Sequence, residues 1–264
     1  MGGSVTFEHI YILKISIITA VFNRADSIAG ALQSVRAQTW HNLEHVLVDG
    51  ASTDGTLQVL QACLSAPARA GYLATCISEP DKGIYDALNK GLARATGDVI
   101  GLMHSDDFFA DNEVLASVAA AFADPAVDAV YGDLDYVAKA DTARIIRRWR
   151  SGAYSPARLA RGWMPPHPTL FLRRSVIERW GGYDISFRIA ADYDTILRYF
   201  GQGQLRPVYI PRVLVKMRLG GESNRSLGRI WLKSREDYTA LKRNGVGGLG
   251  ALAWKNLGKL GQFF

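Results

Sequence analysis

The chain has 264 residues, 48% hydrophobic and 21% charged, which is ordinary for a globular protein and enough for one full core, alone or with an appendage. No stretch approaches the length of a membrane-spanning helix, and residues 1–10 lack the basic start and apolar run of a secretory signal, so we expect a cytoplasmic protein. The net charge of the chain is +6, and residues 229–264 hold seven basic and two acidic residues. This basic end predicts an anionic partner, either a lipid headgroup layer or a phosphorylated acceptor. We expect no nucleic acid as partner, because the sequence has no recognisable nucleic-acid-binding motif.

The first hundred residues alternate short apolar runs with helical patterns. The runs are rich in β-branched residues and predict buried strands at 14–20, 43–48, 72–77 and 98–103. Helices are predicted between them, at about 27–38, 54–64 and 83–96. This alternation indicates an α/β fold, with a Rossmann-like, mostly parallel sheet that carries helices on both faces.

Polar residues follow each of these four strands. They are Phe22-Asn23, Asp49, residues 79–82, and residues 104–107. Ligands of such sheets bind beyond the carboxyl ends of the strands. The four clusters therefore predict one binding site at this edge.

The second half has a less regular pattern. Strands are predicted at 128–137, 143–149 and 169–173, one or two more at 206–218, and a helix at 192–200. Residues 164–168 form a proline-rich connector. Two cysteines, Cys63 and Cys76, lie in predicted core segments without metal-ligand spacing, and we interpret both as small buried apolar residues.

From residue 220 onward the chain becomes basic and glycine-rich, which predicts an extension. Apolar residues recur at helical spacing near its end, while Lys255, Lys259 and Gln262 fall elsewhere on the helical wheel; the apolar set is Leu249, Leu252, Ala253, Leu257, Leu260 and Phe264. A basic amphipathic helix of this kind lies in a membrane interface or packs back on the protein. Both alternatives stay open, the first giving a peripheral protein at the inner face of the cell membrane.

The acidic pair Asp106-Asp107 follows the fourth strand. Adjacent carboxylates repel each other unless a positive charge lies nearby. Mg²⁺ and Mn²⁺ commonly bridge carboxylate and phosphate oxygens, so the pair predicts a divalent metal that holds a diphosphate leaving group.

The chain resembles the family 2 glycosyltransferases, which have the GT-A fold. The matching stretches follow the family's order over roughly residues 14–217: ISIITAVFN (15–23), QTWHNLEHVLVDGASTDG (38–55), DKGIYDALNKGLARATGD (81–98), SDD (105–107) and IAADYDTILR (189–198). The resemblance is closest to bacterial enzymes that build surface polysaccharides or glycolipids. It implies a domain over residues 1–218, with a donor half at about 14–110 and an acceptor half at about 111–218, followed by a helical extension over 219–264.

The resemblance also implies roles for individual residues at the donor site. Thr19, Phe22 and Asn23 would line the nucleotide pocket, and Asp49 would read the base by accepting a hydrogen bond from a ring N–H. Asp81, Lys82 and Gly83 would lie along the base and ribose. Ser105 and Asp106 would also contact the donor, Asp106 at the ribose or the metal, and Asp107 would be the main metal ligand. Many members carry a second acid after the second strand where this chain has Gly50, so uridine, guanosine and thymidine donors stay open.

On the acceptor side, Asp192 matches the family's catalytic Glu-Asp motif, although the preceding residue is Ala191. An inverting member uses this carboxylate as the general base that deprotonates the acceptor hydroxyl. Asp194 is the alternative base, but it is spaced to pair with Arg198 on one helix face. His167 and Arg218 are candidates for contact with the acceptor or the diphosphate. Core packing is the expected role of Trp163 and Tyr183.

The expected function is metal-assisted transfer of a sugar, with inversion, from a nucleoside diphosphate sugar to a saccharide or lipid-linked acceptor. One alternative is an inactive partner subunit that binds nucleotide sugars. A sugar-nucleotide pyrophosphorylase is the other, but residues 20–27 lack the glycine-rich basic loop that would hold a triphosphate.

Overall fold

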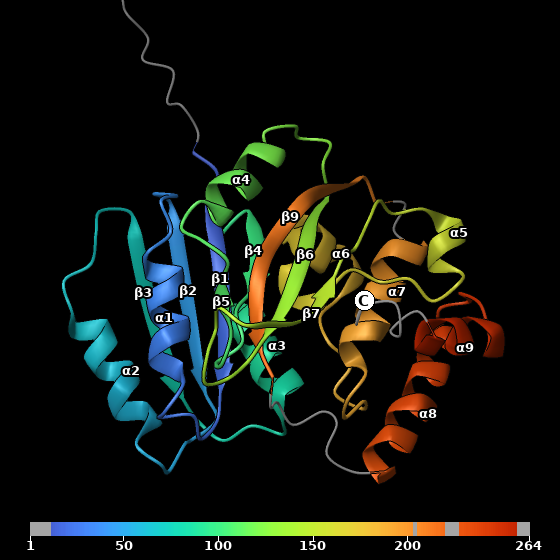
Figure 1. Cartoon of the computed structure of the whole chain (residues 1–264). Helices are drawn as coiled ribbons and strands as arrows, with labels where there is room; N and C mark the ends of the chain where they lie inside the picture. The colour runs from blue at the N-terminus through green and yellow to red at the C-terminus, as the bar shows by residue number, and fades with distance from the viewer. Residues whose placement is uncertain (1–11, 203–204, 220–226, 258–264) are drawn as a thin grey trace, which may run out of the picture.

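A computed structural model describes residues 12–202, 205–219 and 227–257 of the chain. Its strands form one nine-stranded sheet in the order β3-β2-β1-β4-β8-β6-β9-β5, with β7 paired to β6 outside this path (Figure 1). The pairs β1–β2, β2–β3 and β1–β4 are parallel, so three neighbouring pairs share one direction. This half of the sheet is the α/β arrangement that the sequence predicts.

The predicted elements of the first half are confirmed within a few residues. The strands are β1 (Ile15–Val21), β2 (Leu43–Asp49), β3 (Tyr72–Ser78) and β4 (Val99–Leu102). The helices between them are α1 (Ile28–Arg36), α2 (Thr56–Ser65) and α3 (Ile84–Arg94).

The second half is a mixed sheet with short helices. It contains β5 (Phe108–Phe109), α4 (Val114–Ala121), β6 (Ala129–Val137), β7 (Ile145–Trp149), α5 (Pro156–Leu159), the 3-10 turn η1 (His167–Thr169), β8 (Phe171–Arg173), α6 (Arg174–Trp180), α7 (Ala191–Gln202) and β9 (Pro207–Arg218). The sequence pattern misses β5, α4, α5 and α6, because elements this short contain too few residues to display a period. The pattern at 206–218 resolves as one strand, β9, which runs parallel to β6 with two register shifts.

Helices cover both faces of the sheet, as expected. One core cluster joins α1, α2 and α4 to alternate residues of β1, such as Ile15 and Ile17. The opposite face of β1, with Ile18, packs on α3. A third cluster lies under α7 at the β6–β8 side of the sheet and holds large buried aromatic rings, including Tyr131 and Phe200.

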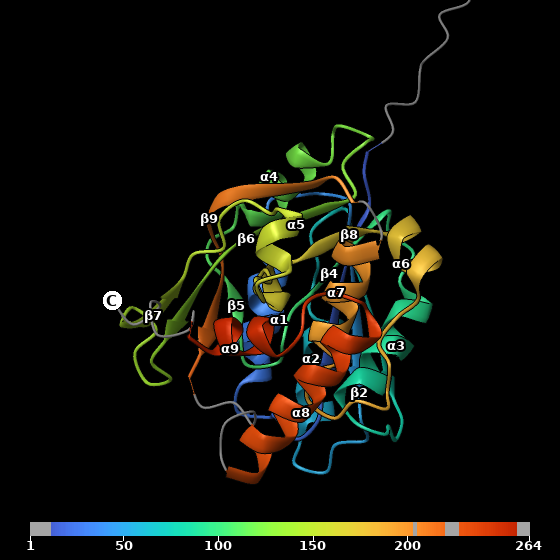
Figure 2. The same cartoon turned by 90° about the vertical axis from the view of Figure 1, so that its right-hand side faces the viewer.

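The C-terminal segment forms α8 (Leu227–Arg243) and α9 (Leu249–Leu257), which lie on the outer side of α7 (Figures 1 and 2). Ala240, Leu241 and Ala251 are buried in the same core cluster as α7. Gly162 permits a close approach of α9, because a Cβ there would lie 2.5 Å from the carbonyl oxygen of Ala251. Residues 249–257 therefore pack back on the protein.

The prediction of which residues form the apolar face of α9 is partly wrong. Ala253 is exposed, whereas Lys255, expected on the polar face, is 7% exposed. Lys255 is buried because its ammonium lies 2.9 Å from the carboxylate of Asp237, a partner that sequence spacing does not reveal. Leu260, Phe264, Lys259 and Gln262 lie outside the described residues.

The two cysteines are free and pack against a core cluster, but each is only half-buried, so their prediction as small buried apolar residues is confirmed only in part. Cys63 lies on α2, and Cys76 lies on β3 at the edge of the sheet, where one side has no covering strand. Over the described ranges, no helix is both long enough and apolar enough to cross a membrane.

Glu44 joins three segments at the amino ends of the strands. Its carboxylate accepts hydrogen bonds from the Ser16 hydroxyl at 2.5 Å, from the Thr96 backbone N–H at 2.6 Å and from the Lys14 ammonium at 3.0 Å. Burial raises the pKa of this carboxyl, but the hydrogen bonds to Ser16, Thr96 and Lys14 outweigh it and leave the pKa lowered to about 2. The interaction aligns β2 with β1 and with the start of β4.

Replacement of this carboxylate tests its contribution to stability. Because the folded-state pKa lies below the ordinary value of 4.5, the ionised group stabilises the protein above about pH 4.5, and this contribution is lost as the pH falls toward 2. We expect Glu44→Gln to lower the free energy of unfolding by about 1–3 kcal/mol near neutral pH. Urea unfolding at several pH values should show this difference narrowing as the solution is acidified; a difference independent of pH would contradict the assignment.

Candidate active site

The loops after β1 and β2 are tied together at the carboxyl edge of the sheet. The backbone N–H of Asn23 donates to the Ser52 hydroxyl at 2.9 Å, and the Asn23 side-chain oxygen accepts from the N–H of Thr53 at 2.9 Å. Asn23 and Ala51 have positive φ angles of 50° and 61°. Such backbone is uncommon outside glycine and clusters at functional sites, where the surrounding structure holds it in place.

Asp49 does not face the solvent at this edge. It is 0% exposed, and its two carboxylate oxygens accept hydrogen bonds from the Ser52 hydroxyl at 2.5 Å and the Ser78 hydroxyl at 2.6 Å. The Ser52 backbone N–H donates to the same carboxylate at 3.2 Å. The side chain of Asp49 therefore holds the loop from inside, and its reading of a base stays a prediction.

Asp81 lies where a second acid after β2 would project. A Cβ built on Gly50 would lie 2.4 Å from Oδ2 of Asp81 and 3.4 Å from the ring of Phe22. Oδ1 of Asp81 accepts from the backbone N–H of Gly83 at 2.8 Å. Since Phe22 is 56% exposed, an open aromatic ring and a carboxylate oxygen meet above Gly50. Glycine at position 50 makes this approach possible.

Three other predicted donor residues differ in their exposure. Lys82 and Gly83 are exposed and lead directly into the N-terminus of α3. Thr19 is 0% exposed, and its hydroxyl lies 3.0 Å from Nε2 of the buried His45, whose pKa is lowered to about 3 by burial. The side chain of Thr19 therefore lies within the sheet and does not line an open pocket.

The predicted metal residues lie in the turn after β4. Asp107 is 1% exposed, and its Oδ1 accepts from the backbone N–H of Arg218 at 3.1 Å. The guanidinium of Arg218 donates to the carbonyl oxygen of Asp106 at 2.6 Å and lies 4.6 Å from the centre of the Phe108 ring. Ser105 is buried beside them. The end of β9 thus brings Arg218 to the acidic pair, and its contact with the acceptor or the diphosphate stays a prediction.

Burial and the neighbouring Asp106 raise the pKa of Asp107 well above its ordinary value. A divalent cation would stabilise the ionised pair, and carboxylate oxygens are suitable ligands for Mg²⁺ or Mn²⁺. Among the described residues, no group of three or more His, Cys, Asp or Glu side chains is arranged to hold a metal. Asp106 and Asp107 are therefore the described carboxylates that would hold a divalent metal at this edge.

Asp192 is half-buried and is the second residue of α7, so the helix begins one residue before the predicted start at 192. The hydroxyl of Tyr85 on α3 lies 3.4 Å from Oδ1 of Asp192 and donates to the carbonyl oxygen of Ile189 at 2.6 Å. Asp194 is buried and pairs with Arg198 at 3.5 Å, as its spacing predicts, and it also accepts from Asn244. These partners favour Asp192 over Asp194 as the reactive carboxylate.

His167 is buried, because the short turn η1 directs it inward between two prolines. Its Nε2 lies 2.9 Å from the hydroxyl of Tyr183, and its ring centre lies 6.0 Å from that of His104. Burial lowers the pKa of His167 to about 4, while Asp192 acts in the opposite direction. Tyr183 and Trp163 both pack against the α7 core cluster, as the sequence predicts.

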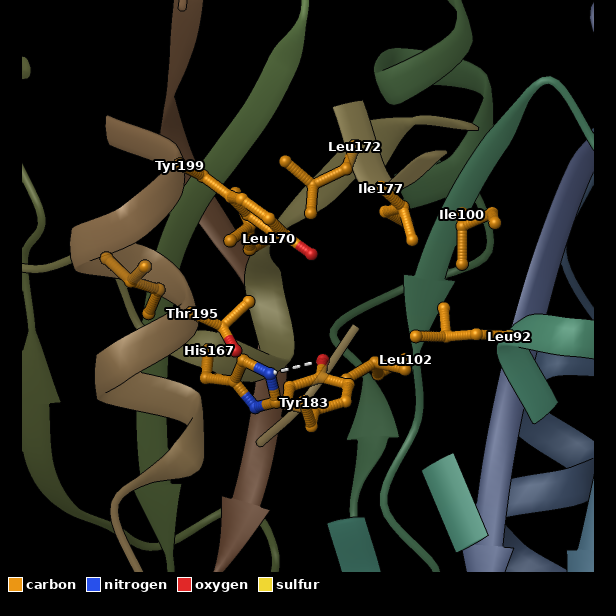
Figure 3. A pocket seen from close by; sticks show the side chains of 11 residues that line it. Leu92, Ile100, Leu102, His167, Leu170, Leu172, Ile177, Tyr183, Thr195 and Tyr199 are labelled. Atoms are coloured by element: carbon orange, nitrogen blue, oxygen red, sulfur yellow. Dashed lines mark hydrogen bonds between the residues drawn. The ribbon is translucent and has the colours of Figure 1, made fainter. Parts of the chain in front are cut away.

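A small cavity lies behind His167 and Tyr183 (Figure 3). Its volume of about 20 Å³ suffices for one water molecule. Aliphatic side chains from β4, α3, α6 and the β8 region form most of its lining. The cavity is too small for a sugar, so it is not itself a donor site.

Two further residues connect the acidic pair with Asp192. The pKa of His104 is lowered by burial and raised in part by both Asp106 and Asp192. Burial raises the pKa of Tyr136, with smaller effects from Arg147, whose guanidinium lies 3.9 Å from the ring centre, and from Asp107 and Asp192. The predicted metal residues and the predicted base therefore act on the same side chains. Sequence analysis placed His104 in its cluster but gave no signal for Tyr136 or Tyr85.

Comparisons with known proteins identify the class that this site defines. The family model described as "Glycosyl transferase family 2" matches residues 16–181. The chain belongs to this family. The PGL/p-HBAD biosynthesis glycosyltransferase of Mycobacterium bovis (strain BCG) is 34% identical over 224 residues, which cover 83% of this chain and 82% of that protein. An uncharacterized glycosyltransferase of Mycobacterium tuberculosis is 34% identical over 192 residues, or 70% of this chain and 68% of the relative.

Solved structures confirm the GT-A fold. One is the mannosyltransferase PcManGT from Pyrobaculum calidifontis, in complex with GDP-Man and Mn²⁺, with a TM-score of 0.65 and 22% sequence identity. The match covers 93% of this chain and 70% of that one. Residues 1–349 of S. aureus TarS, in complex with UDP-GlcNAc, give 0.63 at 18% identity, with 89% of this chain and 66% of that one covered. A longer TarS chain is covered to only 39%.

The different positions of Asp49 and Asp81 predict different effects on stability. We expect Asp49→Ala to lower the free energy of unfolding by roughly 2–3 kcal/mol, because three donors lose a buried acceptor. Asp81→Ala removes one half-exposed hydrogen bond and should cost less than about 1 kcal/mol. Urea unfolding of both variants measures the difference, and equal losses would mean that Asp81 is a structural residue like Asp49.

Proposed function

We propose that this protein transfers a sugar from a nucleoside diphosphate sugar to a hydroxyl acceptor, with inversion and with the help of a divalent metal. The observation that supports this most directly is the buried acidic turn after β4, where the backbone N–H of Arg218 donates to Asp107 and its guanidinium donates to the carbonyl oxygen of Asp106. Metal-binding carboxylates and a separate carboxylate on a helix at the same site are what a single displacement requires.

Asp192 is the proposed general base. It takes the proton of the acceptor hydroxyl while that oxygen forms a bond to the anomeric carbon. The bond from this carbon to the diphosphate oxygen breaks on the opposite face, and a nucleoside diphosphate leaves. Tyr85 donates to the carbonyl oxygen of Ile189, three residues before Asp192, and its hydroxyl lies 3.4 Å from the Asp192 carboxylate.

Asp106 and Asp107 are the residues that would hold Mg²⁺ or Mn²⁺, which when bound neutralises charge on the leaving diphosphate. The Mn²⁺ complex of the Pyrobaculum neighbour supports this assignment. Arg218 holds the acidic turn through its backbone and side chain and adds positive charge beside it.

Asp81 and Phe22 are the proposed base-binding pair. A base can stack on the exposed ring of Phe22 while a ring N–H donates to Oδ2 of Asp81. Uracil, thymine and guanine present such a ring N–H, whereas cytosine and adenine do not. The GDP-Man and UDP-GlcNAc complexes of the structural neighbours agree with this choice.

The acceptor is proposed to be a saccharide or a lipid-linked molecule in bacterial surface polysaccharide or glycolipid assembly. The glycosyltransferase of PGL/p-HBAD biosynthesis, similar over most of its length, supports a glycolipid. Exposed Trp231 and Trp254 on the basic C-terminal helices suit a peripheral contact with an anionic membrane.

Nucleotide binding tests the donor site. We expect UDP, dTDP or GDP to raise the melting temperature in the presence of Mn²⁺, and CDP and ADP to have little effect. Asp107→Asn should abolish the Mn²⁺-dependent part of this shift, because a buried ligand charge is lost. Glu178→Ala, at an exposed position on α6, is the matched control. Full metal-dependent binding by Asp107→Asn would refute the metal assignment.

Turnover tests the proposed base. Release of UDP or GDP from UDP-GlcNAc and GDP-Man is measured with octyl glycosides or water as acceptor. Asp192→Asn should retain nucleotide binding and lose about 10²–10⁴-fold in kcat, since the amide cannot accept the proton. Normal turnover in this variant would exclude Asp192. Nucleotide binding without turnover in the unmodified protein would favour an inactive donor-binding partner.

A further inference from the structure

A carboxylate from α8 holds the backbone immediately before the helix that carries Asp192. Oε1 of Glu236 accepts from the N–H of Arg188 at 3.0 Å, and Oε2 accepts from the N–H of Ile189 at 2.9 Å and of Ala190 at 3.0 Å. Three successive backbone donors thus converge on one side chain, 46 to 48 residues away in the sequence.

This position is the N-terminus of α7. A negative charge near a helix N-terminus is favoured by the helix dipole. Glu236 supplies this charge and accepts hydrogen bonds from the three N–H groups that directly precede α7. Asp192 follows Ala190 by two residues, so the orientation of its backbone depends on this contact.

The next residue of α8 secures the other side of Asp192. Asp237 is buried and pairs with Lys255 of α9 at 2.9 Å, and the Lys255 ammonium lies 3.1 Å from the centre of the Tyr193 ring. Tyr193 directly follows Asp192 in the sequence. On the opposite side, Tyr85 of α3 holds the carbonyl oxygen of Ile189. The first turn of α7 is therefore held between α3 and the C-terminal helices.

We propose that Glu236 is a positioning residue for Asp192, and that α8 is thereby a working part of the active site, although it lies beyond the matched residues 16–181. This inference rests on the proposed function of Asp192 as the base. Glu236 does not touch the substrate. Its carboxylate fixes the first turn of α7, and through it the direction of the Asp192 side chain toward the acceptor hydroxyl.

Removal of the carboxylate should affect turnover more than donor binding. The donor is held by loops after β1 to β4, which Glu236 does not contact, whereas the base moves with the first turn of α7. Displacement of a reacting group by about 1 Å can cost on the order of 100-fold in rate. We expect Glu236→Ala to lower kcat by about 10- to 100-fold, with the Kd for UDP or GDP unchanged.

The experiment compares Glu236→Ala and Glu236→Gln with Glu178→Ala, the exposed control on α6. Glutamine keeps one acceptor oxygen for the backbone N–H groups, so Glu236→Gln should lose less kcat than Glu236→Ala. Some loss remains, because the amide NH₂ replaces the second acceptor oxygen. It also serves as the second variant if alanine fails to fold, which circular dichroism reveals. Turnover is measured with the donor, UDP-GlcNAc or GDP-Man, that the unmodified protein uses.

A double-mutant cycle separates positioning from general structural damage. If Glu236 acts through Asp192, adding Glu236→Gln to Asp192→Asn should cause no further loss of kcat. A further loss equal to that of Glu236→Gln alone would overturn the proposal, as would Glu236 variants with normal kcat and only a lower melting temperature. Equal losses of kcat and of nucleotide affinity would also overturn it.

Hydrogen exchange keeps the inference distinct from the proposed function. Glu236→Gln should increase amide exchange at residues 188–192 and leave the donor loops at 50–55 and 104–107 unchanged. Unchanged exchange at 188–192 would overturn the positioning role. A different result would refute the proposed base instead: full activity of Asp192→Asn, together with increased exchange and impaired turnover in Glu236→Gln. Glu236 would then hold α7 but would not act through Asp192.

Discussion

The parallel pairing of β1 between β2 and β4 is the constraint on which the rest of the structure depends. Ile15 pairs with Leu43 on one side and with Val99 on the other, so the three strands end at a common edge. The loops after them must then lie side by side, and their backbone groups bond to one another. Glu44 keeps this alignment from the opposite end, where its carboxylate joins β2 to β1 and to the loop before β4.

At the carboxyl edge of the sheet, the carboxylates of Asp49 and Asp81 have different surroundings, and the absence of a side chain at Gly50 leaves room for that of Asp81. Asp49 is turned inward by Ser52 and Ser78 and stabilises the loop. Gly50 has no side chain, and Asp81 occupies the space above it beside the exposed ring of Phe22. The loop after β3 therefore places a carboxylate oxygen in the space that the absence of a side chain at Gly50 leaves open, and this is the oxygen to which we propose that a base donates. The chain belongs to the family, but at this position it differs from members that carry two consecutive acidic residues after the second strand.

The acceptor side is built differently, from contacts between distant segments. Arg218 reaches Asp107 across 111 residues, and Tyr85 reaches Asp192 across 107. His167 and Tyr183 pair beside a small, mostly aliphatic cavity that they help to line. Glu236 and the buried pair of Asp237 and Lys255 extend this network into α8 and α9. The C-terminal helices thus share the core of α7 and secure its first turn.

The sequence by itself determined the order of the β–α units, the edge at which polar residues gather, and the family. These features depend on local periodicity and on short motifs, which the linear sequence contains in full. Only the tertiary structure decided which carboxylates are free. Asp49 and Thr19 carry the residue types of a binding site, yet their partners at Ser78 and His45 lie 29 and 26 residues away and bury them. Lys255 was predicted on the polar face of its helix for the same reason, because its partner Asp237 lies on a separate helix and is not visible in the local spacing. Burial and pairing between distant segments are properties of packing, which no spacing within one segment specifies.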